Sequence, residues 1–451
     1  MMGLAKIARN GWAYYAKEIA AGVEDYYVGH GEDPGRWMGR EAEGLGLSGE
    51  ADVEGLSRLF GQGCHPVAGT ALGRPYEADS TAVAGYAISF SPPKSVSILW
   101  ALADEDVSAA VRAGHDAAVA AAMEFLGDHA AFCRRGHGGA SQEETGGLLA
   151  AVFVHRTSRA GDPQLHGHVL AANKVQAVSD GRWLSIDGRE LYEVQKAAGM
   201  LYKACLRAEM TARLGVAWTS VDGNGGAEIV GVPDELITLF SKRRTQVEAA
   251  AAVLVGERQA VLGRSLTGDE HAAVYQLAAY RSRAAKDDDG ETTGQLRSRW
   301  RGEATAAGHP HGRWIGGLAG RRALAPTLTR PARAARRPSL EVALAETIAV
   351  VEREHSTWGR AQVIEALTVV LPTANAKTAA GFRRAVETAA DMVLAHPDVV
   401  RLTCPDRPDT RHGAIRPIKS GPTGATSGCH SHRSETQSER GGEPARRSKP
   451  G

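Results

Sequence analysis

The chain has 451 residues, of which 43% are hydrophobic and 23% charged, a globular composition that excludes wholesale disorder. The formal net charge of +1 does not indicate a nucleic-acid partner, nor does it exclude one, because a basic face can be hidden in a neutral total. No apolar run is long enough to span a membrane, the start lacks the apolar region of a secretory signal, and the five cysteines form no Cys-x-x-Cys pair. We therefore expect a protein of a reducing cytoplasm, without membrane insertion.

Strand and helix signals alternate in the first part of the chain. Residues 85–91 alternate as a short strand that ends at Pro92, because proline cannot extend a ladder. An alanine-rich segment at 107–126 predicts a helix. Residues 148–155 and 166–175 are two further strands, and their connector carries a Gly-Asp-Pro turn signal. These two strands predict an antiparallel hairpin.

The later part of the chain is mainly helical. A helix is predicted at 189–214 with Gly215 as its stop, and polar helices follow over 234–282. The composition then changes twice, to a stretch rich in arginine, proline and alanine and to a basic tail rich in Gly, Ser, Pro and Thr. We predict four regions: a mixed α/β domain at 1–300, a linker at 301–337, a small helical unit at 338–405 and a disordered tail at 406–451.

Three histidines lie at the ends of the predicted hairpin. His166 and His168 are two residues apart in a strand, so both imidazoles point to one face of the sheet. If the two strands pair, His155 adds a third nitrogen at the same point. Three neutral imidazoles with an open position are a known arrangement for a catalytic divalent ion. The alternative is two surface histidines on an edge strand and a third in a loop.

Two tyrosine pairs lie near the N-terminus, Tyr14-Tyr15 and Tyr26-Tyr27. A phenolate is a competent nucleophile toward phosphorus, and two separate tyrosines would permit two successive strand transfers. The alternative interpretation is that these amphipathic side chains pack at a helix edge with their hydroxyl groups hydrogen-bonded.

Several basic residues are candidates for contacts with a DNA backbone. Lys94 follows Pro92-Pro93, and with the nearby hydroxyl groups it is placed to bind phosphate oxygens; the same turn is also an ordinary strand-to-helix connection with Ser95 as the helix N-cap. Arg156 and Arg159 lie between the histidines and either contact phosphates or are simply solvated. The cluster at 242–244 is open to the same two interpretations.

Four motifs, taken in order, resemble the relaxase domain of the conjugative relaxase-helicase family of the F and related plasmids (the TraI/TrwC-like, MobF group). They are the tyrosine pair at 14–15, the segment EDYY at 24–27 followed by PGRW at 34–37, FSPPKSVS at 90–97, and HRTSRAGDPQLHGH at 155–168. The helix at 202–216 also resembles a family segment. The resemblance covers about the first 300 residues and is weaker through the helical unit.

The resemblance implies an α+β fold, with an antiparallel sheet flanked by helices, of the histidine-hydrophobe-histidine type. It implies a DNA nickase that cuts one strand at a plasmid transfer origin, stays joined to the 5′ end through a phosphotyrosine and later rejoins the strand. Tyr14 resembles the first nucleophile and Tyr26 the second, with Tyr15 and Tyr27 as their companions. The three histidines match the metal ligands, with Mg²⁺ or Mn²⁺ expected and Zn²⁺ as a further candidate.

The same resemblance implies the partners: single-stranded or hairpin DNA at the transfer origin, accessory relaxosome proteins, a coupling protein and a separate helicase. It places the protein in a bacterial cytoplasm, with transfer to the recipient alongside the DNA. No nucleotide cofactor is expected, because the phosphate-cradling motif G-x-x-x-x-G-K-[ST] is absent from the sequence. We therefore expect a relaxase without its own motor.

Two positions depart from the family pattern. Ala87 stands where an acidic residue usually orients or deprotonates the nucleophile, and Gly167 stands between the two histidines where a larger polar residue is common. Gly167 is expected to loosen the strand without removing a ligand. The sequence leaves three alternatives to a conjugative relaxase: a rolling-circle replication-initiator nickase, an origin-binding protein impaired in catalysis, and a metal-dependent phosphohydrolase.

Overall fold

The computed structural model describes residues 2–13, 35–77, 82–282, 291–310, 315, 340–373, 376–402 and 415–417. Three sequence predictions concern residues outside these ranges. They are the roles of Tyr14, Tyr15, Tyr26 and Tyr27, most of the linker at 301–337, and nearly all of the tail at 406–451.

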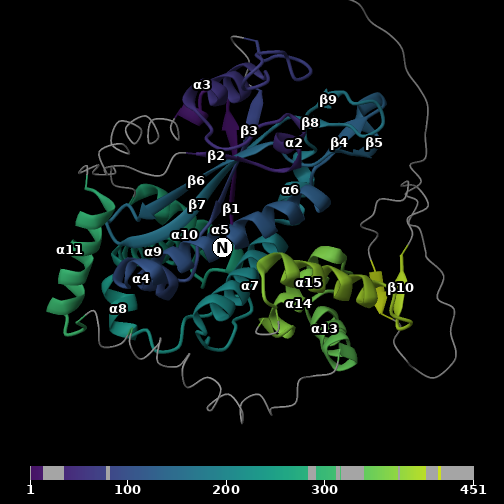
Figure 1. The fold of residues 1–451 in the computed structure, drawn as a ribbon. Coiled ribbons are helices and arrows are strands. Elements are labelled where there is room, and N and C mark those ends of the chain that lie inside the picture. Colours follow the sequence, from purple (N-terminus) through teal and green to yellow (C-terminus); the bar gives the residue numbers. More distant parts are fainter. Residues whose placement is uncertain are drawn as a thin grey trace, which may run out of the picture. The chain divides into compact units, whose positions relative to one another are not determined.

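Five antiparallel strands form the central sheet, with the order β1-β3-β7-β6-β2 (Figure 1). In that order their bounds are Gly3–Ala8, Val83–Phe90, Pro163–Ala172, Ala150–Thr157 and Arg36–Met38. The predicted α+β class, with an antiparallel sheet flanked by helices, is confirmed. The predicted hairpin is confirmed as well, because β6 and β7 pair directly at the centre of the sheet.

Side chains on the two faces of the sheet enter two separate hydrophobic clusters. One face packs against α4 (Lys94–Leu102), α5 (Glu105–His129) and α7 (Gln195–Leu214), through residues such as Leu165 and Val169. The other face packs against α2 (Arg40–Gly44), α3 (Val53–Leu56) and the π-helical turn η1 (Ser57–Gln62). Strand residues alternate between the clusters with period two, as a pleated strand requires.

The predicted helix at 189–214 is two helices, α6 (Gly188–Glu193) and α7, which meet at Val194. The expected stop is correct, because Gly215 follows α7 with a left-handed φ of 67°, a conformation that favours glycine. Two small two-stranded ribbons lie outside the central sheet: β4 (Phe132–Arg135) with β5 (Ser141–Glu144), joined through η2 (His137–Gly139), and β8 (Val175–Gln176) with β9 (Trp183–Leu184).

The polar helices after residue 233 are α8 (Asp234–Leu239), α9 (Lys242–Leu262), α10 (Gly268–Arg281) and α11 (Thr293–Ala306). Helix α11 lies at the left of Figure 1 and packs against α4. It crosses residue 300, where the sequence analysis placed a domain boundary, and its Trp300 is fully buried. The four-region division itself stays a prediction.

Helices α13 (Leu340–Glu354), α14 (Arg360–Val370) and α15 (Ala379–Leu394) follow, with a ribbon of β10 (Val399–Arg401) and β11 (Ile415–Pro417). Helix α15 contacts α5 and α7, and α14 contacts α7. The buried Arg207 of α7 donates to the Thr368 carbonyl, at 3.0 Å. The helical unit therefore shares a core with the sheet. None of the described helices is long and apolar enough to cross a membrane.

Candidate functional site

The three histidines of the hairpin converge on one point. His155 of β6 lies directly opposite His166 of β7, and His168 is two residues further along the same face. The ring centroids are 5.2 Å apart for His155 and His166, 4.8 Å for His155 and His168, and 4.9 Å for His166 and His168. The alternative of a third histidine in a loop is therefore wrong, because His155 lies within a strand.

The donor set suits a divalent ion. One ring nitrogen from each histidine lies within 4.8 Å of the others. A metal ion binds imidazole nitrogen at about 2.1 Å, so small side-chain rotations bring all three onto one ion. Nδ1 of His166 donates to the Gln164 carbonyl oxygen at 2.8 Å, an arrangement that leaves Nε2 with its lone pair for a metal. The residues present thus fit the ion that the sequence predicts.

The histidines open into a cleft of about 880 Å³. The hairpin and α4 form one wall, and the other wall comes from Glu228 and the helices α8, α9 and α10. Both cationic and anionic side chains line this cleft. The cations are Lys94, Arg159, Arg243 and Arg244, and the anions are Asp162, Glu228 and Glu248. The cleft is large enough for an extended segment of a polymer, and its cations are spread along the walls.

Lys94 starts helix α4 and reaches the hairpin. Its Nζ donates to the Pro163 carbonyl at 3.0 Å and to the Gln164 side-chain oxygen at 2.8 Å. Burial lowers the pKa of Lys94 to about 8, although Asp162 and Glu228 act in the opposite direction. This lysine fixes the strand that carries two of the histidines, and its contact with phosphate stays a prediction.

The predicted N-cap at Ser95 is wrong. Helix α4 begins at Lys94, and Pro93 precedes it without a side-chain cap. The Ser95 amide donates to Glu228 at 2.9 Å, and the Ser95 hydroxyl accepts from the Ile229 amide at 2.8 Å. A carboxylate that is distant in the sequence satisfies the helix start, which local sequence patterns do not reveal.

The other basic candidates differ in exposure. Arg156 is buried at 8% exposure, and its guanidinium donates to the Thr293 hydroxyl of α11, so most of this side chain is enclosed. Arg159 lines the cleft. Lys242 contacts Glu303 at 2.7 Å, and Arg244 contacts Glu248 at 2.7 Å. The DNA contacts of Lys94, Arg156 and Arg159 stay predictions.

Both departures from the family pattern lie on β3 and β7 beside the histidines. Ala87 pairs with Leu170, and its neighbour Ser89 on the same face pairs with His168. Gly167 continues the ladder on both sides. A Cβ at Gly167 would lie 3.3 Å from Nε2 of His115, a buried residue of α5, so this position points to the opposite face from the histidine trio.

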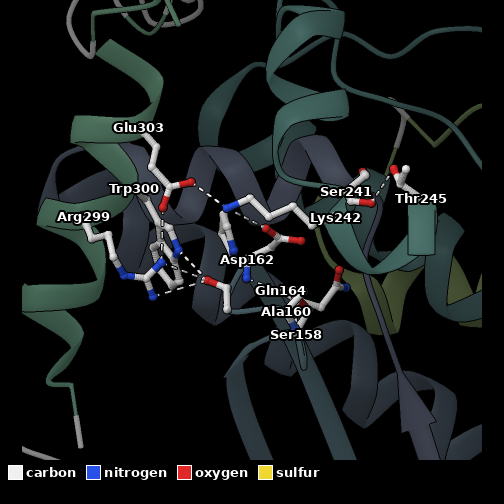
Figure 2. Close-up of polar contacts among 12 residues, drawn as sticks. Ser158, Ala160, Asp162, Gln164, Ser241, Lys242, Thr245, Arg299, Trp300 and Glu303 are labelled. Carbon is white, nitrogen blue, oxygen red and sulfur yellow. Dashed lines mark hydrogen bonds and ion pairs between the residues drawn. The ribbon is translucent and has the colours of Figure 1, made fainter. Parts of the chain in front are cut away.

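Sequence reasoning missed Asp162 and Trp300. Asp162 was part of a turn signal, yet it is 1% exposed and lines the cleft. Trp300 lies far along the chain, but its Nε1 donates to the Gly161 carbonyl of the hairpin turn at 2.8 Å (Figure 2). The Gly-Asp-Pro motif could have indicated Asp162, because it places an acidic residue in the turn between the two strands that carry the histidines. Nothing in the sequence pointed to Trp300.

The chain matches a family model described as TrwC relaxase over residues 8–307. It is 33% identical over 275 residues to the multifunctional conjugation protein TraI of Escherichia coli strain K12, covering 59% of this chain and 15% of that protein. A second TraI of Escherichia coli is 33% identical over 250 residues, covering 54% of this chain and 13% of the relative. The chain thus matches only a small part of these relatives.

Solved structures of the conjugative relaxase TrwC in complex with OriT DNA are also similar. The metal-free complex has a TM-score of 0.55 at 28% identity, and the metal-bound complex has 0.53 at 27%. Each match covers 69% of this chain and 100% of the other. A TrwC complex with a 27-mer DNA comprising the recognition hairpin and the cleavage site has a TM-score of 0.54 at 28% identity.

Proposed function

Because the chain belongs to the TrwC relaxase family, we propose that it nicks one DNA strand at a plasmid transfer origin, forms a 5′-phosphotyrosyl adduct and later rejoins the strand. The observation that carries the proposal is the convergence of His155, His166 and His168 at the floor of an open cleft. The DNA that occupies the related TrwC structures, including a recognition hairpin, gives the substrate class: single-stranded and hairpin DNA of the origin.

The proposed reaction is a transesterification with Tyr14 as the first nucleophile. The Tyr14 oxygen attacks the scissile phosphorus, the bond from phosphorus to the 3′ oxygen breaks, and the leaving 3′ oxygen takes up a proton. Tyr26 has the corresponding role in the second transfer, with Tyr15 and Tyr27 beside them. The phosphodiester energy is kept in the tyrosyl ester, so rejoining needs no nucleotide.

The histidine trio would hold a divalent ion, with Mg²⁺ or Mn²⁺ favoured and Zn²⁺ as a further candidate. When bound, such an ion stabilises negative charge developing on phosphate oxygens. The chain's own residues then do the rest: His166 is oriented by its bond to the Gln164 carbonyl, and Lys94 fixes the strand below it. Arg159 lines the cleft wall, which supports a role for it in contacting the backbone of the DNA.

The decisive experiment is a search for the covalent adduct. The full chain is incubated with Mn²⁺ or Mg²⁺ and a labelled single-stranded oligonucleotide from the DNA adjacent to its gene, then run on a denaturing gel. We expect a protein band that carries the label, and we expect Tyr14→Phe to lose it by at least about 100-fold, since the nucleophile is removed. Tyr192→Phe, an exposed tyrosine outside the cleft, is the control.

Full adduct formation by Tyr14→Phe would refute its role as the first nucleophile. Release of free 5′ phosphate without an adduct would instead indicate a phosphohydrolase. Cleavage of a rolling-circle replication origin in preference to a transfer origin would favour a replication initiator.

One observation supports a second candidate, an origin-binding protein impaired in catalysis. Ala87 offers no carboxylate beside His168, where the family usually has an acidic residue. Binding of the origin hairpin with no adduct under any divalent metal would favour this candidate. For the relaxase, we propose accessory relaxosome proteins, a coupling protein and a separate helicase as partners, and a bacterial cytoplasm as the location before transfer to the recipient.

A further inference from the structure

The hairpin that carries the histidines is weakly fixed by its own ladder beyond the site. The pair of His155 and His166 is followed by a bulge, because the register shifts between His155 and Thr157. The next pair joins Thr157 to Pro163, and proline has no N–H to donate. A bulge increases local twist and re-aims the strand. The turn has bonds of its own, since the Ser158 amide donates to the Asp162 carbonyl at 2.9 Å and the Asp162 amide donates to the Ser158 hydroxyl at 3.2 Å. Contacts from outside the hairpin then support this segment.

That support reaches each residue from 161 to 165. Trp300 donates to the Gly161 carbonyl at 2.8 Å, and Lys242 lies 3.5 Å from the Asp162 carboxylate. Lys94 binds the next two residues, as described above, and the Ser97 hydroxyl accepts from the Leu165 amide at 3.2 Å. His166 comes directly after this run.

Helix α11 contacts both arms of the hairpin. Its first residue, Thr293, accepts from Arg156 in the bulge of β6, and Trp300 two turns later binds the turn before β7. Figure 2 shows Glu303 of the same helix bonded to Lys242, which lies between it and Asp162. Burial raises the pKa of Asp162, whereas Lys94 and Lys242 lower it, so these cations offset the cost of enclosing the carboxylate.

Helix α11 is itself attached to the C-terminal end of helix α4. Arg297 donates to the Ala101 carbonyl at 3.2 Å, and Arg301 donates to the carbonyls of Leu102 and Ala103 at 3.3 and 2.7 Å. These carbonyls are at the C-terminal end of α4, where helical carbonyls lack partners. Lys94 and Ser97 at the other end of α4 contact the hairpin. Helix α4, helix α11 and the turn thus form a closed frame.

We propose that α11 is the positioning element of this hairpin: through Thr293 and Trp300 it sets the distance of His155 from His166 and His168. The inference rests on the proposed function of this trio as a metal site. It assigns a role to a helix whose sequence, more than 120 residues beyond the histidines, indicates only a polar surface element.

The test compares two tryptophan variants in the full-length protein. Trp300→Phe keeps a buried ring but removes the indole donor to the Gly161 carbonyl, which leaves only the longer bonds from Arg299 at 3.5 Å. Trp100→Phe is the matched control, because Trp100 is also buried and packs edge-on against Trp300 at 6.1 Å. Mn²⁺ and Zn²⁺ affinities are measured by titration calorimetry without DNA. Thermal unfolding of the metal-free protein measures the loss of Tm that each substitution causes through altered packing.

We expect Trp300→Phe to weaken metal binding about 3- to 10-fold, the equivalent of one hydrogen bond, and Trp100→Phe to leave the affinity unchanged at a similar loss of Tm. Thr293→Val, which keeps the shape of the side chain and removes the hydroxyl, is expected to weaken binding in the same direction. In cleavage assays at limiting metal, both variants should recover wild-type rates when metal is raised.

Wild-type affinity in both Trp300→Phe and Thr293→Val would overturn the proposal. Equal weakening in Trp100→Phe would also overturn it, since the effect would then reflect packing alone. If the wild-type protein binds neither ion, the metal site of the proposed function fails first, and the inference falls with it. These outcomes are distinguishable because the wild-type titration is read independently of the variants.

Discussion

Histidines lie on both faces of the central sheet, and their surroundings are opposite. On the cleft face, His155, His166 and His168 converge beside polar groups and solvent. On the face that packs against α4, α5 and α7, called here the helical face, His115 of α5 is fully buried behind Gly167. Its Nδ1 lies 2.8 Å from the Tyr202 hydroxyl. The pKa of His115 is lowered to about 3, mainly by burial and also by Arg112 and His166. One side chain type thus offers grouped ring nitrogens on one face and a neutral packing group on the other.

Solvent access and hydrogen-bond partners, more than residue type, therefore decide what an imidazole does in this fold. A buried histidine with one hydroxyl partner stays neutral and contributes to the core. Histidines grouped at a cleft keep lone pairs that an ion can use. The backbone of β7 separates the two kinds by the thickness of one strand, and the single residue between His166 and His168 faces the buried one.

Removal of a cleft histidine should have the largest effect. We expect His168→Ala to weaken metal binding by more than about 100-fold, because even residues that only orient a ligand cost about 10- to 100-fold. Adduct formation at limiting metal should fall in parallel. Titration with Mn²⁺ and the denaturing gel measure the two effects. His137→Ala, an exposed histidine of η2, is the control. Unchanged affinity and cleavage in His168→Ala would show that the trio is not the metal site.

A larger side chain at Gly167 should clash with helix α5 on the buried face of the sheet. A Cβ there would lie 3.3 Å from Nε2 of His115 and 3.6 Å from Val119, so Gly167→Val overpacks the helical face. We expect a loss of about 1–3 kcal/mol in the free energy of unfolding. Urea denaturation measures it, and His115→Ala in the same background should recover part of the loss by making space. A destabilisation that is the same with and without His115 would contradict this packing account.

An effect of pH on stability is also expected, and it should be specific to the buried histidine. The unfolded chain protonates His115 near pH 6.5, whereas the folded chain does so only near pH 3. Between these values the unfolded state binds more protons, so this group's contribution to stability is lost as pH falls from about 6.5. His115→Phe should therefore lose less stability than the wild type between pH 7 and 4.5, as measured by urea denaturation. A difference between the two proteins that does not change with pH would contradict this sign.

Much of the site could be predicted from local pattern. The alternation of β6 and β7, the turn signal between them and the two-residue spacing of His166 and His168 are properties of neighbouring residues, and strand geometry converts them directly into one shared face. Gly215 as a helix stop is of the same kind. The cap of α4 could not be predicted, because its carboxylate, Glu228, is over 130 residues from the amide that it accepts from.

Local sequence alone predicts the hairpin and the trio of imidazoles, since each follows from a periodicity or a spacing of a few residues, whereas the antiparallel α+β class came from the resemblance of several motifs to a known family. Tertiary structure decided what surrounds them. It turned Lys94 toward the hairpin carbonyls, enclosed Asp162, placed Trp300 on the turn and separated His115 from the cleft by one strand. These contacts join segments far apart in the chain, and their formation depends on the packing of whole helices, which no short stretch of sequence encodes.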